Sequence, residues 1–321
     1  MSNSAASDAP SAPILSITDG RAVVLLNRPR QHNRIEPQDL IALEQFFARV
    51  AADAAVRVLV LTATGKSFSS GFHIGALVER NAGEDANYDR DAFERTVDRL
   101  ERLRVPTIAA LNGSVYGGAT DLALARDFRI GVERMQLLMP AARLGIVYYE
   151  SGVRRYVTRL GVGAAKKLFM TAQPIDAAEM LRIGHLDEIV PSAQLMARVE
   201  ALAATLTANA RLAVAGLKQA INETAAGTLD RAALAAIRAR CSESDDHQEA
   251  LRAWAEKRPR SSPEIDRIKA HCSNSSSGSS GSQAGSISDS RTGAASNSYN
   301  VRASLAGPRR DPNAKIRTLR R

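Results

Sequence analysis

The stretch Ala110–Gly131, ALNGSVYGGATDLALARDFRIG, decides the fold. Its first residues end the apolar run Thr107–Leu111, which is typical of a buried strand, and Gly113–Gly118 then bends the chain into a helix. Phe128–Gly131 is a further short strand after that helix. A strand, a helix and another strand in this order predict an α/β core.

The same alternation extends towards the N-terminus. Ile14–Ile17 and Ala22–Leu26 are short β runs on either side of the turn signal Asp19-Gly20, which predicts a hairpin. Pro37 suits the start of a helix, and Val56–Leu61 is another strand of the buried type. From Ser151 to about Lys257 the pattern is helical almost throughout, so a helical region follows the α/β core.

Four segments are expected along the 321 residues. Residues 1–11 form a flexible N-terminus, 12–195 the α/β core, 196–272 a helical C-terminal or oligomerisation region, and 273–321 a disordered basic tail. Residues 273–304 contain 13 serines and almost no large apolar side chain, so they cannot bury enough surface to offset their ordering entropy.

The formal net charge of +9 is unevenly placed. From Ser273 onward there are eight basic and two acidic residues, so the tail carries +6 and the first 272 residues only +3. The tail is therefore either a solvated extension or an electrostatic tether to nucleic acid or an anionic surface. Because Tyr299 is its one aromatic residue, we do not expect nucleic-acid contact through it.

Composition excludes several other classes of protein. No stretch approaches the roughly 18–20 apolar residues of a membrane span, and no secretory signal is visible. The two cysteines, Cys241 and Cys272, have no metal-ligand spacing, which excludes a disulfide scaffold and a zinc module. We therefore expect a cytoplasmic protein without a membrane partner and without a metal site.

Two glycine-rich loops leave strands and are candidates for a binding site. Gly65–Phe72 follows one strand, and Asn112–Gly118 leaves the next strand and enters a helix. Glycines allow backbone N–H groups to approach a ligand, and two such groups facing each other form an oxyanion hole. A tight structural turn explains either loop equally well. Neither loop matches a nucleotide-phosphate motif.

Four segments in order resemble the enoyl-CoA hydratase/isomerase (crotonase) superfamily over residues 12–257. They are LNRPRQHNRI (Leu26–Ile35), VLVLTATGKSFSSGFHIGAL (Val58–Leu77), the Ala110–Gly131 stretch, and Arg143–Pro191. The resemblance implies an α/β fold, a crotonase-like spiral of ββα units with a C-terminal helical region, assembled as a homotrimer or hexamer. It also implies an acyl-CoA substrate, with coenzyme A entering as part of the substrate and no separate cofactor.

The resemblance also implies positions for the site residues. The thioester oxygen is expected between the amides of Phe72 and Gly118. The positions expected to line the substrate and CoA channel are Arg34, Ser70, Ile74, Tyr116, Gly117, Ala141 and Tyr148. Lys218 resembles a basic position near the CoA phosphates, although a solvated helix face is an equal alternative.

Catalytic groups depart from the family pattern. Hydratases of this family use two glutamates, and the matching positions here are Asp121 and Ala141, so the paired-carboxylate mechanism is in doubt. Asp121 is a catalytic candidate, although an acid in the first turn of a helix is also favourable by itself. His73 stands where most relatives have aspartate and is a second candidate. Tyr149 and Glu150 are two more, although Tyr148 and Tyr149 also suit an acyl-pocket wall.

Three functions remain open. The first is an enzyme that acts on an acyl-CoA through an oxyanion-hole-stabilised enolate, by hydration, isomerisation, or cleavage or hydrolysis. The second is a non-catalytic acyl-CoA-binding relative, favoured by the missing acid at Ala141. The third is a nucleic-acid-associated protein that works through the basic tail.

Overall fold

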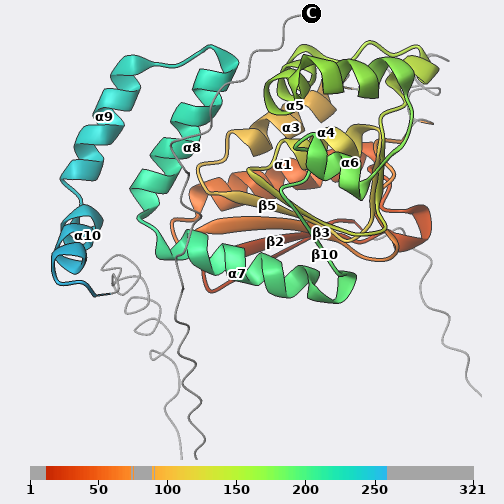
Figure 1. The fold of residues 1–321 in the computed structure, drawn as a ribbon. Helices are drawn as coiled ribbons and strands as arrows, with labels where there is room; N and C mark the ends of the chain where they lie inside the picture. The colour runs from red at the N-terminus through yellow and green to blue at the C-terminus, as the bar shows by residue number, and fades with distance from the viewer. Residues whose placement is uncertain (1–11, 74, 76–88, 90, 259–321) are drawn as a thin grey trace, which may run out of the picture. The chain divides into compact units, whose positions relative to one another are not determined.

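The computed structural model describes residues 12–73, 75, 89 and 91–258 (Figure 1). Its larger sheet has the strand order β1-β2-β3-β5-β7-β10. Its strands are β1 (Ile14–Thr18), β2 (Arg21–Leu26), β3 (Val58–Ala63), β5 (Thr107–Leu111), β7 (Phe128–Val132) and β10 (Glu188–Val190). The β1–β2 pair is an antiparallel hairpin, and every later pairing in this sheet is parallel. The predicted hairpin is thereby confirmed.

A second sheet has the order β4-β6-β8-β9. Its strands are β4 (Ser67–Ser69), β6 (Ser114–Tyr116), β8 (Gln136–Leu138) and β9 (Ile175–Asp176). β3 leads into β4, β5 into β6 and β7 into β8, so each unit contributes one strand to each sheet. The repeated strand–strand–helix order confirms the predicted spiral of ββα units.

The helices cover both faces of the larger sheet. α1 (Pro37–Ala52) and α3 (Ala92–Glu101) lie on one face, and α7 (Leu195–Ala208) packs on the other, against β3, β5 and β7 (Figure 1). Because both faces are covered, every residue of β3 and β5 is buried. This explains why these two strands consist almost entirely of apolar residues.

The remaining helices come after strands of the second sheet or lie in the C-terminal part of the chain. They are α4 (Gly118–Leu124), α5 (Glu150–Thr171), α6 (Ala177–Arg182), α8 (Arg211–Ala226), α9 (Arg231–Ser242) and α10 (Asp245–Ala255). Short 3-10 turns occur at Pro29–Gln31, Ala141–Leu144 and Ser192–Gln194. In the described part of the chain, no helix combines the length and apolar character that crossing a membrane requires.

Two details of the sequence prediction were wrong. The segments read as loops after β3 and β5 contain β4 and β6, and the long stretch read as helical contains β9 and β10. All four strands have two or three residues, too few for a period-2 pattern to be recognised. The expectations for residues 1–11, for Ile74 and for the basic tail lie outside the described residues.

Candidate active site

The two glycine-rich loops are in direct contact at the carboxyl ends of β4 and β6. Gly71 has φ +88°, and a Cβ atom built on it would lie 2.4 Å from the Tyr116 carbonyl oxygen and 3.1 Å from the Gly118 nitrogen. Only glycine fits this close approach and this backbone conformation. The residue before Phe72 therefore lies against the amide of Gly118.

Local hydrogen bonds orient the two candidate amides. The Ile35 amide donates to the Gly71 carbonyl and the His73 amide donates to the Ile35 carbonyl, each at 2.9 Å. Since amides alternate in direction along an extended chain, the Phe72 N–H is directed away from Ile35. Gly118 is the first residue of α4, so its amide has no carbonyl acceptor within the helix. Both amides are thus placed at the contact between the loops.

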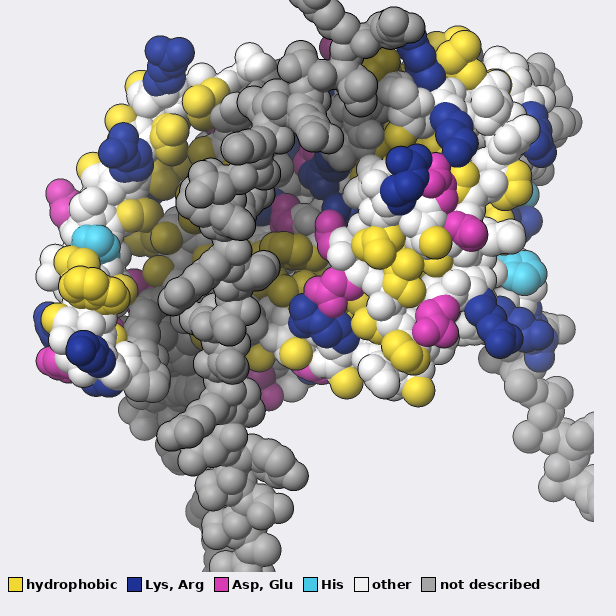
Figure 2. All heavy atoms as spheres, in the orientation of Figure 1, with side chains coloured by type: hydrophobic (Ala, Val, Ile, Leu, Met, Phe, Trp, Pro, Cys, Tyr) yellow, Lys and Arg dark blue, Asp and Glu magenta, His cyan; other side chains and the backbone are white. Residues whose placement is uncertain are grey.

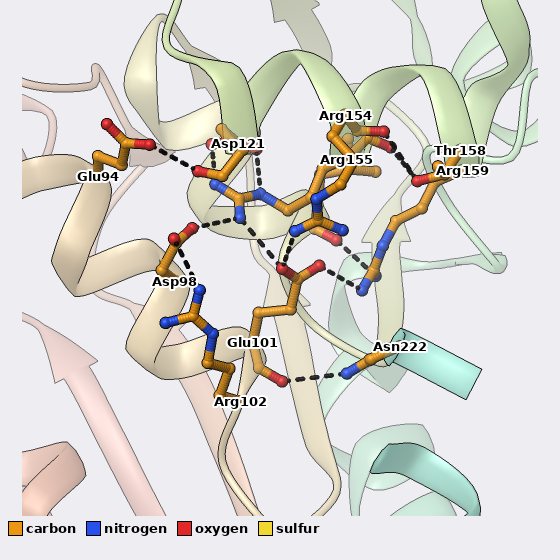
Figure 3. Close-up of polar contacts among 12 residues, drawn as sticks. Glu94, Asp98, Glu101, Arg102, Asp121, Arg154, Arg155, Thr158, Arg159 and Asn222 are labelled. Atoms are coloured by element: carbon orange, nitrogen blue, oxygen red, sulfur yellow. Dashed lines mark hydrogen bonds and ion pairs between the residues drawn. The ribbon is translucent and has the colours of Figure 1, made fainter. Parts of the chain in front are cut away.

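Asp121, in the first turn of α4, is completely buried and already fully engaged (Figure 3). Arg155 of α5 donates from Nε to Oδ1 at 2.9 Å and from Nη2 to Oδ2 at 2.8 Å. The Tyr149 hydroxyl donates to Oδ2 as well. A two-pronged arginine contact with neither partner exposed is the strongest form of this ion pair.

Arg155 also joins Asp121 to a larger network of charges. Its Nη1 lies 2.7 Å from Asp98 Oδ1 and 3.2 Å from Glu101 Oε2. Burial and the hydrogen bonds to Asp121 act in opposite directions on the pKa of Arg155, and the carboxylate prevails, so this pKa is raised. Burial alone would raise the pKa of Glu101, but the positive charge of Arg155 and its arginine neighbours lowers it. Both shifts favour the charged forms of Arg155 and Glu101.

The second family acid position carries no carboxylate. Ala141 is buried at the start of the 3-10 turn Ala141–Leu144. Glu150 is the first residue of α5 and is exposed, and no hydrogen bond or ion pair of its side chain is present within the described residues. No contact among the described residues orients this carboxylate towards the loops that hold Phe72 and Gly118.

A series of aromatic ring contacts connects Phe72 to Tyr149, whose hydroxyl donates to Asp121. The ring centroids of Phe72 and Phe93 are 5.8 Å apart, and those of Phe93 and Tyr149 6.3 Å. Tyr148 stacks on Tyr149 at 4.3 Å. Burial, followed by the charge of Asp121, raises the pKa of both tyrosines, so their hydroxyls keep their protons at neutral pH. Tyr149 is therefore a hydrogen-bond donor rather than a base.

His73, one residue after Phe72, is held by the carboxylate of Glu36. Its Nδ1 lies 2.8 Å from Glu36 Oε2, and its side chain is 26% exposed. The Arg34 guanidinium lies 2.6 Å from the other oxygen of Glu36. Arg34, Glu36 and His73 thus form one cluster beside the candidate oxyanion hole.

The remaining predicted binding residues are divided between two places. Ser70, Tyr116 and Gly117 are partly exposed on the two loops, and a Cβ atom on Gly117 would meet open space. Lys218 lies elsewhere, on α8, where its ammonium lies 2.7 Å from Asp127 Oδ2 and donates to the Val105 carbonyl at 2.9 Å. Its charge is used within the chain, in a buried contact that ties α8 to the core.

Sequence reasoning missed Arg155 and Glu36. Arg155 is 34 residues from Asp121, and Glu36 is 37 residues from His73, so neither pair has a recognisable local spacing. The one available signal for Arg155 was an arginine at an apolar position of a helix, a pattern that usually requires a buried acidic partner.

Comparison with known proteins agrees with the fold. The family model of enoyl-CoA hydratase/isomerase matches residues 16–262. A short-chain-enoyl-CoA hydratase of Clostridium acetobutylicum is 34% identical over 240 residues, 74% of this chain and 92% of that protein. A crotonyl-CoA hydratase of Syntrophomonas wolfei is 33% identical over 249 residues, 76% of this chain and 95% of that protein.

A comparison with solved structures indicates the same family. The crystal structure of an enoyl-CoA hydratase from Bacillus anthracis superposes with a TM-score of 0.68 at 30% identity, and covers 78% of this chain and 98% of that one. This chain belongs to the enoyl-CoA hydratase/isomerase family, whose members act on CoA thioesters.

Proposed function

We propose that this protein forms the enolate of an acyl-CoA thioester in an oxyanion hole built from the Phe72 and Gly118 amides, and that it hydrates simple 2-enoyl-CoAs poorly. The observation that carries this proposal is the state of Asp121, whose two carboxylate oxygens are both occupied by Arg155 and Tyr149. Coenzyme A is the only cofactor group required, and it enters with the substrate.

The oxyanion hole is supported by the contact between the two loops. Gly71 lies against the Gly118 nitrogen, and the alternation of the chain turns the Phe72 amide away from Ile35. The start of α4 adds the positive end of its helix dipole at the same place. Such donors stabilise a thioester oxygen as it gains negative charge, whichever later step the enzyme performs.

Slow hydration is expected from the residues at the two family acid positions, Asp121 and Ala141. Addition of water requires one group to take a proton from water and another to deliver a proton to the adjacent carbon. Protonation of Asp121 would remove the one of the three carboxylates around Arg155 that is completely buried with it, which is costly. Ala141 has no proton to transfer. Isomerisation and proton exchange, which need only one acid/base group, are therefore favoured over hydration.

The first test restores a carboxylate at position 141. Ala141→Glu is expected to increase the rate of crotonyl-CoA hydration by about 10²-fold or more, because one general acid typically contributes 10²–10⁴. Ala142→Glu is the matched control, since it adds the same charge at an exposed neighbouring position and is expected to change nothing. If Ala141→Glu binds crotonyl-CoA but hydrates it no faster than the wild type, the assignment of the missing acid is wrong.

A non-catalytic acyl-CoA-binding protein is the second candidate. The engaged carboxylate of Asp121 and the alanine at 141 favour it as much as they favour poor hydration. The two candidates differ in one readout, the exchange of thioester α-protons with solvent. An enzyme that forms an enolate exchanges them, and a protein that only binds does not.

We also propose a homotrimer or hexamer. In support, large apolar side chains of α8 and α10 are exposed in the single chain, and Figure 2 shows hydrophobic side chains along these helices. They include Leu217 (62% exposed), Ile221 (65%) and Trp254 (82%). Light scattering is expected to give three or six times the mass of one chain at micromolar concentration. A monomer under these conditions contradicts the proposal.

A further inference from the structure

His73 and Glu36 are brought together by the backbone. Ile35 and Phe72 form an isolated parallel bridge, so the next residue on each segment, Glu36 and His73, stands beside the other. The hydrogen bonds from the Ile35 and His73 amides fix this register, each at 2.9 Å. The imidazole therefore has a fixed place one residue after the candidate oxyanion donor Phe72.

Glu36 is itself held rigidly. Its amide donates to Asp39 Oδ2 at 2.8 Å in the first turn of α1, which begins at Pro37. Its Oε1 accepts from Arg34 Nε at 2.6 Å, and its Oε2 faces His73 Nδ1. With a side-chain exposure of 11%, the carboxylate is nearly removed from solvent. An imidazole placed against such a carboxylate has little orientational freedom.

The contact also selects the tautomer of His73. Glu36 as a carboxylate only accepts hydrogen bonds, so Nδ1 of a neutral His73 carries the proton and Nε2 carries the free lone pair. Within the described residues no hydrogen bond or ion pair engages Nε2, which lies beside the backbone of Gly75, where a Cβ atom would stand 2.5 Å from it. An imidazole that a carboxylate orients at one nitrogen, with its other nitrogen unengaged, is the usual arrangement of a general base. Asp121, Tyr149 and Glu150 lack this combination of orientation and a free lone pair.

We propose that His73 is the catalytic acid/base of this site and that Glu36 is its positioning residue. This inference rests on the proposed formation of an enolate. In the step, His73 Nε2 takes a proton from C2 of the acyl group, and the electron pair of the broken C–H bond moves to the thioester oxygen. The resulting imidazolium lies beside Glu36 and returns the proton to C2. Where the acyl group carries a 3,4 double bond, the imidazolium can instead deliver the proton to C4, and the double bond then moves to C2–C3.

The experiment follows α-proton exchange. Butyryl-CoA is incubated in D₂O with the full-length protein, and uptake of deuterium at C2 is measured by mass spectrometry. His73→Gln is expected to slow exchange by about 10²–10⁴-fold, the usual contribution of a general base. Its dissociation constant for butyryl-CoA, measured by calorimetry, is expected to stay close to that of the wild type.

Two further measurements distinguish a positioning role of Glu36 from a merely structural one. Glu36→Gln is expected to slow α-proton exchange without weakening the binding of butyryl-CoA. ¹⁵N NMR of His73 is expected to show the Nδ1–H tautomer in the wild type and a mixture of the two tautomers in Glu36→Gln. The matched controls are Glu44→Gln, on the same helix and in an ion pair with Arg99, and His247→Gln, exposed on α10. Both controls are expected to exchange at the wild-type rate.

The outcomes distinguish the inference from the proposed function. Wild-type exchange that persists in His73→Gln overturns the role of His73 and leaves enolate formation intact. No exchange by the wild type, although it binds butyryl-CoA, overturns both. If His73→Gln loses binding, His73→Asn replaces it, and the same two results decide.

Discussion

Replacement of Arg155 by methionine is expected to lower the free energy of unfolding by about 3–5 kcal/mol, the typical cost of removing one partner of a buried ion pair. Arg155 and Asp121 are both completely buried, so the variant leaves the Asp121 carboxylate without its main partner and with no access to water. Asp98 and Glu101 lose a neighbouring positive charge at the same time. Urea unfolding at fixed protein concentration measures the change.

Arg126 provides a matched control for this variant. It is also completely buried, but within the described part of the chain none of its guanidinium nitrogens has a hydrogen-bond partner. Burial lowers the pKa of Arg126 well below its usual value. Arg126→Met is therefore expected to be neutral or stabilising, since it removes a buried charge that gains no hydrogen bond in return. Equal losses in the two variants would mean that packing, not the pair with Asp121, explains the effect of Arg155.

Gly118→Pro is expected to reduce the rate of thioester α-proton exchange by about 10²–10³-fold, the usual cost of removing one oxyanion-hole donor. Proline has no amide proton and suits the first position of a helix, where Gly118 lies. The new side chain would press on Phe93, because a Cβ atom at Gly118 would lie 2.7 Å from Phe93 Cζ. Part of any loss therefore comes from steric contact.

Gly118→Ala measures that steric part. Alanine adds the same Cβ atom beside Phe93 but keeps the amide proton, so the difference between the two variants is assigned to the hydrogen-bond donor. Deuterium uptake by butyryl-CoA is followed for both. If Gly118→Pro and Gly118→Ala exchange at the same rate, the amide of Gly118 does not stabilise the enolate.

The sequence predicted the strands with strong local patterns and missed the elements defined by tertiary contacts. The predicted strand Thr107–Leu111 coincides with β5, and the helix expected at Pro37 begins there. Their apolar runs and start signals are contained within single segments. β4 and β9 are strands only because they pair with β6 and β8, which are distant in sequence.

In the candidate site, too, the sequence indicated individual residues but not the tertiary contacts between them. The family resemblance pointed to Asp121, Phe72 and Gly118, and the structure brings the two glycine loops together. What the motif did not contain is the chemical state of each residue. Arg155 engages the carboxylate of Asp121 from another helix, and a backbone bridge places Glu36 beside His73. Such contacts depend on how helices and loops pack, and no spacing within one segment encodes them.

We expect Asp121 to act as a structural anion that takes no part in proton transfer. This role is tested most directly by the rate of crotonyl-CoA hydration of the wild type beside Asp121→Asn, with the folded fraction of each confirmed by circular dichroism. Slow hydration by the wild type and a similar rate for the variant are expected. Rapid wild-type hydration that Asp121→Asn reduces by about 10²–10⁴-fold, as expected for a catalytic carboxylate, would contradict it.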